Sequence, residues 1–346
     1  MKSTSKVLYV IVATLVGAGF ASGKEIYSFF FVYGTKGIFG IIISGALISW
    51  VAYKVLMLCY VNGISTFQEF CNYLIGRCFP GKVCGAVNEI SGVINGVMNV
   101  ILLITFYIMI SGFSSFLYQE FYVGRVVGSI VIIFLCYVAF KRNVDGLVKI
   151  SNYLIPVLII FLVFISVKNV DFIENYNSIK YVFVESGWVV PVVKAVLYGS
   201  YNCILLVPVI VALNGVVSGK RASLMVGVAT FVTIVVLSFS VYNILLLGDV
   251  QTFALEMPII QIVKRYGGLC RLVYVVMIAI SIYTTAISTG CGFLNGSSKS
   301  RFGRNLVLMC ASAVVLSQIS FSTFIELLYP VLGVIGFVEV VAIFRA

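Results

Sequence analysis

Histidine is absent from the 346 residues of this sequence, and charged side chains make up only 10% of it. Without an imidazole, the chain has no histidine metal ligand, no serine–histidine or cysteine–histidine pair and no histidine pH switch. The aspartates, Asp145, Asp171 and Asp249, are all predicted to lie in loops. The nine cysteines include no C-x-x-C pair, which favours reduced packing residues. These absences argue against an enzyme, a cofactor and a structural metal centre.

Polar residues are too few to cover a water-facing surface. Hydrophobic residues make up 61% of the chain and the mean hydropathy is +1.14, whereas soluble proteins average roughly 45–50% apolar residues. Segments 126–140 and 153–167 are continuously apolar. That pattern is typical of a spanning helix, because the strands of a transmembrane barrel alternate apolar and polar residues. The sequence therefore predicts an all-α integral membrane protein.

Long apolar segments recur along the whole chain. Because a spanning helix needs about 20 apolar residues, we predict about ten transmembrane helices, near residues 7–32, 38–61, 83–114, 121–140, 148–168, 188–214, 222–247, 269–295, 304–319 and 323–344. Two connections, 66–78 and 256–267, mix apolar and charged residues as helices at a membrane interface do. We predict that both pack over the bundle.

The distribution of basic residues predicts the orientation. An even number of crossings leaves both termini on one side of the membrane, and most of the 23 lysines and arginines fall in the segments on that side. Cytoplasmic segments carry an excess of positive charge, so both termini are predicted to be cytoplasmic. The net charge of +11 is then explained by the topology and requires no nucleic-acid partner.

A short pattern occurs in both halves of the chain. Ala13-x-Leu15-x-Gly17 in the first predicted span matches Ala195-x-Leu197-x-Gly199 in the sixth. Because five crossings separate the two, the halves must enter the membrane from opposite sides, as in the inverted repeats of secondary transporters. We therefore predict two five-helix repeats, 1–168 and 188–346, within one membrane domain.

Glycines interrupt the first span and predict a discontinuous helix. Gly17, Gly19 and Gly23 lie within seven residues, and glycine costs a helix about 1 kcal/mol relative to alanine. Freed peptide groups at membrane depth are tolerated only around a cavity or a ligand. Gly199-Ser200-Tyr201-Asn202 predicts a second break in the sixth span. The alternative is a seam of small residues for close helix packing.

Other polar residues in the spans allow more than one interpretation. Lys24 and Glu25 follow the first break and predict a gate, a mutually neutralising pair or an interfacial cap. Lys149 is interpreted as a cytoplasmic anchor, the alternative being a substitute for a bound cation. Asn95 and Asn99 belong to a polar stripe of the third span, which favours packing between helices, although either amide could reach a central cavity.

The string GAGFASGKEI at residues 17–26, the ten-helix length and the pair Thr284-Thr285 resemble the YkvI-like family of bacterial membrane proteins. That family is similar to the amino acid–polyamine–organocation superfamily, whose members have the LeuT-type fold. The resemblance covers essentially the whole chain. It implies a five-plus-five inverted repeat in the bacterial cytoplasmic membrane, with a solute held between the discontinuous first and sixth helices.

The resemblance also implies the binding residues. A solute carboxylate would meet the amides of Gly17-Ala18-Gly19, and an ammonium group would meet carbonyls of the sixth helix. The substrate set is then Gly17, Ala18, Gly19, Phe20, Ser22, Asn95, Asn99, Tyr198, Gly199, Ser200, Tyr201 and Asn202. A coupling sodium ion would use carbonyls of Gly17 and Phe20 with the hydroxyls of Ser281, Thr284 and Thr285. The alternative is the adjacent set about one turn later, Thr285, Ser288 and Thr289.

These features predict a secondary transporter of a small amino-acid-like solute that works by alternating access. Na⁺ or H⁺ is expected as the coupling ion, and no other cofactor. The expected partners are a small-molecule solute and membrane lipid, and the sequence leaves the oligomeric state open. The alternative is a membrane-embedded receptor with a transporter-like fold, because the resemblance extends to subunits that sense a ligand without moving it.

Overall fold

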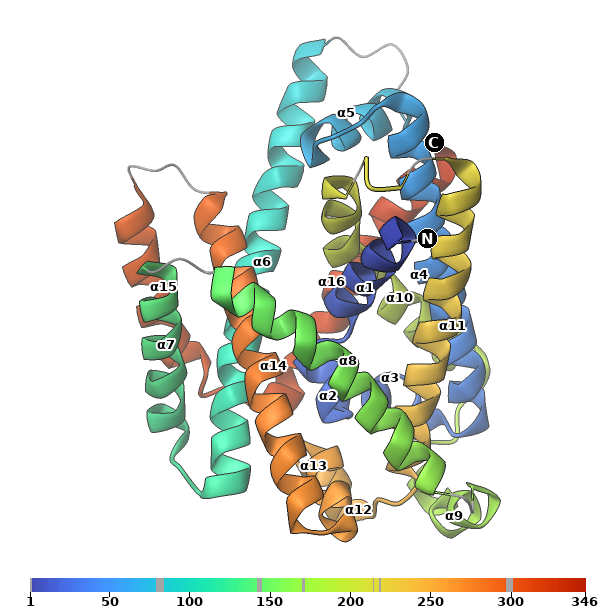
Figure 1. Cartoon of the computed structure of the whole chain (residues 1–346), viewed down its shortest axis with the longest axis vertical. Coiled ribbons are helices and arrows are strands. Elements are labelled where there is room, and N and C mark those ends of the chain that lie inside the picture. The colour runs from blue at the N-terminus through green and yellow to red at the C-terminus, as the bar shows by residue number, and fades with distance from the viewer. Residues whose placement is uncertain are drawn as a thin grey trace.

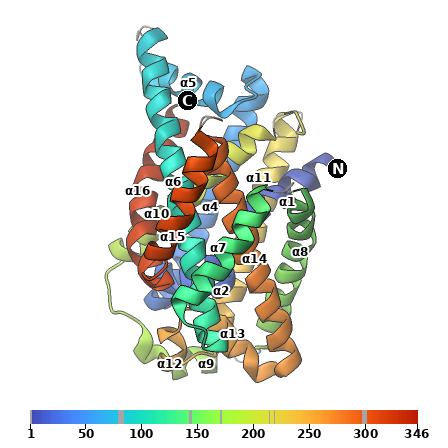
Figure 2. The same cartoon turned by 90° about the vertical axis from the view of Figure 1, so that its left-hand side faces the viewer.

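The computed structural model describes residues 2–78, 84–141, 145–169, 172–213, 215–217, 219–296 and 301–346. These residues fold into a bundle of helices with short connections. Both ends of the chain lie at the same end of the bundle, together with α5, while α9, α12 and α13 lie at the opposite end (Figures 1 and 2). The shared end agrees with the even number of crossings predicted from the sequence.

The bounds of the helices follow the predicted spans closely. The elements are α1 (Lys2–Leu15), α2 (Ala18–Ser22), α3 (Lys24–Phe29), η1 (Phe31–Tyr33), α4 (Thr35–Asn62), α5 (Phe67–Cys78), α6 (Cys84–Phe121), α7 (Arg125–Lys141), α8 (Asp145–Lys168), α9 (Phe172–Ser178), η2 (Lys180–Val182), α10 (Val189–Ala212), α11 (Lys220–Leu245), α12 (Val250–Ala254), α13 (Pro258–Val263), η3 (Lys264–Tyr266), α14 (Gly268–Asn295), α15 (Phe302–Leu316) and α16 (Phe321–Arg345).

Six helices in the described part of the chain are long and apolar enough to cross a membrane by themselves, namely α4, α6 from Glu89, α10, α11, α14 and α16. The number rises to seven if the bent pair Ile155–Lys168 and Phe172–Ser178 is taken as one span. The count is below the predicted ten because the first span is divided among α1, α2 and α3, while α7 has 17 residues and α15 has 15.

Helix α10 occupies the interior of the bundle. It packs along α4 on one side and α16 on the other, while α6 packs along α14. Glycines allow the close approach of α16 to α10. A Cβ atom on Gly336 would lie 2.1 Å from the carbonyl oxygen of Ser200, and one on Gly333 would lie 2.6 Å from that of Leu197. Both distances are far below van der Waals contact, so only glycine fits at these two positions.

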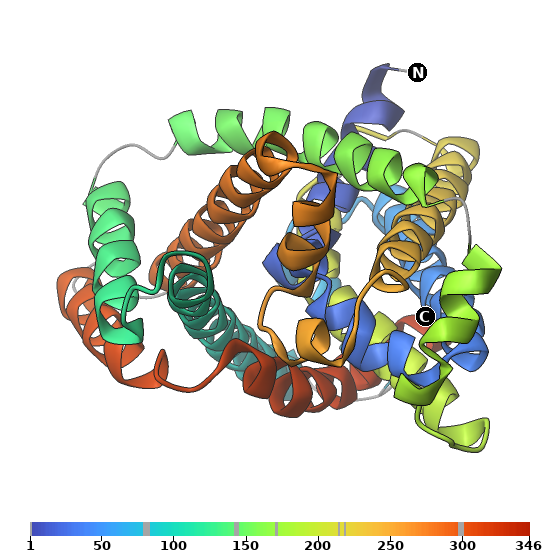
Figure 3. The ribbon, with the colours of Figure 1, turned by 90° about the horizontal axis from the view of Figure 1, so that it is seen from below.

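The two predicted interfacial segments are helical and pack against the bundle. Segment 66–78 forms α5, which contacts α6, α10 and α16 at the end that carries the termini. Segment 256–267 forms α13 and η3, and α13 contacts α2, α11 and α14. Seen from its own end of the molecule, the α12–α13 segment lies over the interior of the bundle rather than at its rim (Figure 3).

The first predicted break is confirmed and the second is wrong. Helix α10 runs without interruption through residues 199–202. Asn202 donates its side-chain amide to the carbonyl oxygen of Tyr198 one turn earlier (2.8 Å), which keeps this polar group satisfied within the helix. A Cβ atom on Gly199 would lie 2.8 Å from the side chain of Leu47. Gly199 therefore serves close packing between α10 and α4, the alternative considered for both spans.

Candidate functional site

The break in the first span consists of two changes of backbone direction. Gly17, between α1 and α2, is extended (φ −88°, ψ −173°), and Gly23, between α2 and α3, is left-handed (φ 83°, ψ −7°). A Cβ atom on Gly23 would also lie 2.7 Å from the side chain of Ile259 in α13. Glycine is therefore required at position 23 both by its backbone conformation and by the helix packed above it.

Several backbone groups of the break are satisfied within the break itself. The carbonyl of Gly17 accepts from the amide of Ala21, and that of Phe20 accepts from the amide of Gly23, both at 3.0 Å. The hydroxyl of Ser22 donates to the carbonyl of Gly19 at 2.8 Å and accepts from the amide of Lys24 at 3.2 Å. These bonds explain how a non-helical segment is stable inside the bundle.

Glu25 places a carboxylate directly against the break. The residue is only 3% exposed, and one carboxylate oxygen accepts a hydrogen bond from the hydroxyl of Tyr201 in α10 at 2.7 Å. The other oxygen lies where a side chain on Gly19 would be, because a Cβ atom there would come within 1.9 Å of it. Gly19 thus makes room for the side chain of Glu25 within the same broken span.

Four aromatic rings gather around this carboxylate. The centroid of the Tyr201 ring lies 4.4 Å from that of the tilted ring of Tyr329 in α16 and 5.5 Å from that of Tyr198. Phe29 of α3 lies 5.3 Å from the ring of Tyr198. All four residues are at most 5% exposed. We call Phe29, Tyr198, Tyr201 and Tyr329 the aromatic cluster.

A small apolar cavity lies beside the aromatic cluster. It has a volume of about 10 Å³, room for about one water molecule. The first span, α4, α10 and α11 line it with Val12, Leu15, Val16, Phe20, Ile48, Tyr198, Asn202, Ile234 and Leu237. The structure therefore brings together, around the break, predicted residues from the first and the sixth span. Tyr198 belongs to both the cavity and the aromatic cluster.

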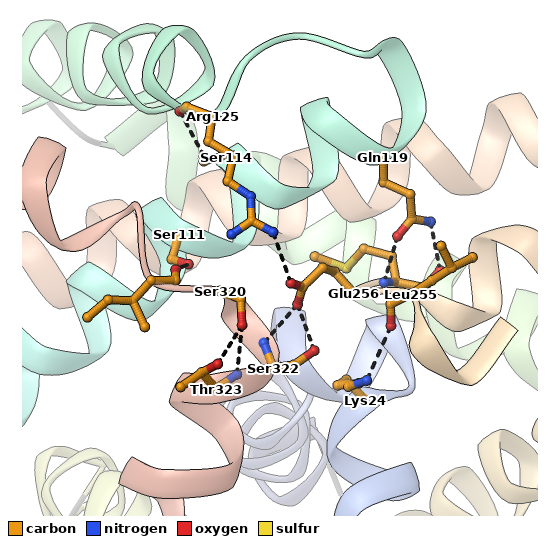
Figure 4. A network of polar contacts seen from close by, with 12 residues as sticks. Lys24, Ser111, Ser114, Gln119, Arg125, Leu255, Glu256, Ser320, Ser322 and Thr323 are labelled. Carbon is orange, nitrogen blue, oxygen red and sulfur yellow. Dashed lines mark hydrogen bonds and ion pairs between the residues drawn. The ribbon is translucent and has the colours of Figure 1, made fainter. Parts of the chain in front are cut away.

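Lys24 and Glu25 point to different partners, so they are not a mutually neutralising pair. The ammonium group of Lys24 donates to the carbonyl oxygen of Phe253 at 3.0 Å, at the end of α12. It also donates to that of Leu255 at 3.3 Å (Figure 4). It also lies 5.3 Å from the ring centroid of Tyr27. The buried ammonium therefore attaches the broken span to the α12–α13 segment.

Further polar contacts fix the α12–α13 segment to α6, α7 and α16 (Figure 4). Glu256 accepts from the amide (2.8 Å) and hydroxyl (2.7 Å) of Ser322 and is contacted by Arg125 at 3.4 Å. Gln119 exchanges two hydrogen bonds with the backbone of Met257, at 2.9 and 3.2 Å. The bundle is thus closed over the site at the end opposite the termini.

The predicted cation residues on α14 are only partly brought together. Ser281 is buried, and the hydroxyls of Thr284 and Thr285 both donate to its carbonyl oxygen, at 3.1 and 2.8 Å. Ser288 lies on the exposed side of α14, which removes it from the interior. Helix α14 does contact α2, and the hydroxyl of Tyr274 donates to the carbonyl of Ala21.

Asn95 and Asn99 lie away from the cavity. The amide of Asn95 donates to the side chain of Gln68 in α5, so it joins α6 to that helix. The amide of Asn99 lies against Gly296 at the end of α14, where a Cβ atom would come within 2.1 Å of its oxygen. Both asparagines therefore serve packing between helices, the interpretation favoured for their stripe. The side chain of Lys149 lies outside the described residues.

The sequence analysis did not predict the place of Tyr329 in the site or the partner of Glu25. Tyr329 gave no signal, because it is one of 20 tyrosines and lies in the last span, far from either predicted break. Glu25 did give a signal, since a charged residue within an apolar span defaults to a functional role. Its hydrogen-bond partner, Tyr201 of α10, is brought to it by the fold, whereas the adjacent Lys24 points elsewhere. Ser200 is buried, and its hydroxyl lacks a hydrogen-bond partner among the described residues.

Comparison with known proteins supports the family resemblance. No protein-family model matches the chain. The chain is 29% identical over 346 residues to the uncharacterized membrane protein YkvI of Bacillus subtilis (strain 168), covering 96% of this chain and 93% of YkvI. It is 23% identical over 353 residues to the uncharacterized protein YyaD of the same strain, with the same two coverages. The chain is a relative of YkvI, as its sequence predicted.

The fold also has a counterpart among solved structures. The chain is similar to MHP1, a nucleobase-cation-symport-1 family transporter, in a closed conformation with bromovinylhydantoin bound. The TM-score is 0.54 at 11% sequence identity, and the match covers 93% of this chain and 74% of that one. At this identity the similarity shows a shared fold alone. The described part of the chain thus shares an all-helical fold with that transporter, and the five-plus-five repeat implied by the resemblance stays a prediction.

Proposed function

We propose that this relative of YkvI is a secondary transporter that carries a small amino-acid-like solute across the bacterial cytoplasmic membrane by alternating access. The observation that carries the proposal is the broken first span, in which Val16 and Phe20, on either side of Gly17, line a cavity together with Tyr198 and Asn202 of α10. Such backbone is tolerated inside a membrane protein where it borders a cavity or a ligand. The fold shared with MHP1 supports the same reading.

The solute would be held between the break and the facing turns of α10. Around the cavity, Phe20 comes from the broken span, while Tyr198 and Asn202 come from α10. The unpartnered hydroxyl of Ser200 and the hydroxyl of Tyr201 offer further polar contacts. The remaining proposed contacts are backbone groups of Gly17, Ala18, Gly19 and Gly199, and the hydroxyl of Ser22.

The contacts between helices support a five-plus-five inverted repeat, with halves 1–168 and 188–346. In such a repeat α4 corresponds to α11, α5 to α13, α6 to α14, α7 to α15, and α8 to α16. The packing of α6 on α7 is matched by that of α14 on α15, and the packing of α5 on α6 by that of α13 on α14. Likewise, α8 contacts α11 and α14, while α16 contacts α4 and α6.

Coupling to Na⁺ or H⁺ would supply the driving force. The carbonyls of Gly17 and Phe20 each retain a second lone pair for a cation, although each already accepts one backbone hydrogen bond. Ser281, Thr284 and Thr285 would complete a sodium site from α14, which contacts α2. With cytoplasmic termini, as the basic residues predict, the α12–α13 segment closes the site on the outer side.

Uptake into proteoliposomes tests the proposal. The purified protein is reconstituted, and accumulation of a mixture of amino acids and amines is measured by mass spectrometry under an imposed sodium or pH gradient. We expect saturable, gradient-driven accumulation that is lost in Gly19→Leu, because even a Cβ atom at this position meets Glu25. The double variant Thr284→Ala, Thr285→Ala should lose accumulation driven by sodium.

Gly303→Leu is the matched control, because no atom lies within 4 Å of a Cβ atom at that exposed position. It should transport as the wild type does. Equal uptake by Gly19→Leu would refute the assignment of the site. Ligand-induced thermal stabilisation without any accumulation would refute transport and favour a receptor.

A further inference from the structure

We propose that the solute bound at the break is an organic cation, a primary amine with an apolar chain, and that Glu25 is its counter-ion. This inference rests on the proposed function and narrows its substrate class. Three features of the described residues support it. Glu25 has a buried carboxyl group without an ionic partner, and aromatic rings lie beside it. One oxygen of the same carboxyl group lies against Gly19 in the stretch Gly17-Ala18-Gly19.

Glu25 is a buried carboxyl group that forms no ion pair with a cationic side chain among the described residues. The ion pairs of that part of the chain join Arg125 to Glu256 and Arg271 to Glu120. Lys24 donates to backbone carbonyls of the α12–α13 segment, and Lys194 lies over the ring of Phe29 at 5.5 Å from its centroid. Burial of an unpaired charge is costly. A positively charged ligand would supply the missing partner.

The aromatic cluster suits the same ligand. Rings present a negative face, which attracts ammonium groups within about 6 Å of the centroid. The hydroxyl of Tyr201 contacts the carboxylate directly, and the rings of Tyr198 and Tyr329 lie against that of Tyr201. Phe29 lies against Tyr198. A carboxylate with aromatic rings beside it is a favourable environment for a desolvated ammonium group.

The position of Glu25 also disfavours a carboxylate on the solute. One oxygen of Glu25 lies directly against Gly19, within the stretch Gly17-Ala18-Gly19. A solute carboxylate bound to these amides would therefore lie close to a second carboxylate, and like charges repel strongly at low dielectric constant. An amine without a carboxyl group avoids this repulsion. The proposed class of amino-acid-like solutes is thereby narrowed to amines that lack the carboxyl group.

The lining of the cavity next to the aromatic cluster indicates the polarity of the solute's substituent, the part other than its ammonium group. Its lining is apolar apart from Tyr198 and Asn202, and the side chain of Asn202 already donates to the backbone of Tyr198. No charged residue lines it. Because Tyr198 borders both regions, an ammonium group at Glu25 would direct its substituent toward this cavity. Its apolar lining favours an alkyl substituent over a polar one.

Three compounds with one carbon skeleton separate the classes: isoamylamine is a cation, leucine is a zwitterion and isoamyl alcohol is neutral. Each is titrated against the detergent-purified protein, and the midpoint of thermal unfolding is recorded. We expect isoamylamine to raise the midpoint of the wild type in a saturable way and the other two to have little effect. In Glu25→Gln the amine should need at least about tenfold higher concentration, the loss expected when one charged interaction is removed.

Glu25→Gln is a narrow perturbation, because glutamine retains an oxygen that accepts from Tyr201 and differs mainly in charge. Glu174→Gln makes the same chemical change on the exposed side of α9 and should leave amine binding unchanged. If Glu25→Gln does not fold, the wild-type series still decides the class. Equal or stronger stabilisation by leucine or by the alcohol would overturn the proposal.

Other outcomes separate this inference from the proposed function. Unchanged amine binding by Glu25→Gln refutes the counter-ion, even if solutes accumulate in proteoliposomes. If that variant binds the amine normally but loses uptake driven by a pH gradient, Glu25 carries a proton and the inference is also overturned. Glu25-dependent binding of isoamylamine without accumulation upholds the binding site and refutes transport.

Discussion

Replacing Lys24 with methionine should open the end of the bundle that the α12–α13 segment closes. The ammonium group makes two hydrogen bonds, to the carbonyls of Phe253 and Leu255, from a side chain that is 4% exposed. Hydrogen bonds from charged donors contribute about 1.5–3 kcal/mol each, offset by the cost of burying the ammonium group. Methionine keeps the apolar stem beside Tyr27 and leaves two carbonyls without these donors. We expect the closed arrangement to lose about 1–3 kcal/mol.

Hydrogen exchange of the backbone amides in residues 250–263 measures this loss. A change of about 1–3 kcal/mol corresponds to exchange that is about 5- to 150-fold faster. Lys36→Met is the matched control, because Lys36 also donates to a loop carbonyl, that of Ser186, and lies over the ring of Trp188. It should leave the exchange of residues 250–263 unchanged. Equal exchange in the wild type and Lys24→Met would refute the role of Lys24 in closure.

Three further predictions concern stability. Gly336→Ala should lower the free energy of unfolding by about 1–3 kcal/mol, because its Cβ atom would meet the carbonyl of Ser200 at 2.1 Å. Gly76→Ala, with no atom within 4 Å of its Cβ atom, should not, and equal melting temperatures of the two variants would contradict this reasoning. Glu339→Leu should raise the melting temperature, because one buried carboxylate oxygen of Glu339 has no hydrogen-bond partner among the described residues. A lower melting temperature for this variant would contradict that reasoning. The backbone amides of Ser65 and Thr66 donate to the carboxylate of Glu69 and hold its pKa below the ordinary value. The stability that the ionised Glu69 contributes is therefore complete above the ordinary pKa of a glutamate and is lost as the pH falls through the lowered pKa of the folded protein. Proteolysis of the loop before α5 should then quicken only in acid, with Glu69→Gln cleaved faster than the wild type already at neutral pH.

The extent of the helices could be predicted because apolar composition and length are properties of a local segment. Predicted span 38–61 became α4 (Thr35–Asn62), and 269–295 became α14 (Gly268–Asn295). The two interfacial segments could also be predicted, because their mixture of charge and apolar residues is local. The number of independent spans could not, since the first span folds into three short helices and α15 is shorter than a membrane crossing.

The site could be predicted only in part, because it depends on which residues meet across the fold. The string GAGFASGKEI correctly located the break, and Tyr198 and Tyr201 were named on the facing helix. The pairing of Glu25 with Tyr201 joins residues 176 positions apart. The sequence allowed Asn95 to reach a cavity. In the structure α5 packs against α6, and Asn95 donates to Gln68 of α5 instead. Long-range contacts of this kind leave no periodic trace in a single sequence.

Gly17 and Gly199, the glycines that match in the first and sixth spans, have opposite surroundings. A Cβ atom at Gly17 would meet no atom within 4 Å. The backbone at this position is therefore not packed against another helix, and the neighbouring Val16 lines the cavity. On α10 and α16 the opposite holds, because Gly199, Gly333 and Gly336 each face an atom closer than 3.0 Å and serve close packing. The pattern Ala-x-Leu-x-Gly is common to both spans, yet only the first has a left-handed glycine, Gly23, six residues later. Helix α10 packs against both α4 and α16 and keeps its regular backbone hydrogen bonds, so the non-helical backbone of the site comes from the first span alone.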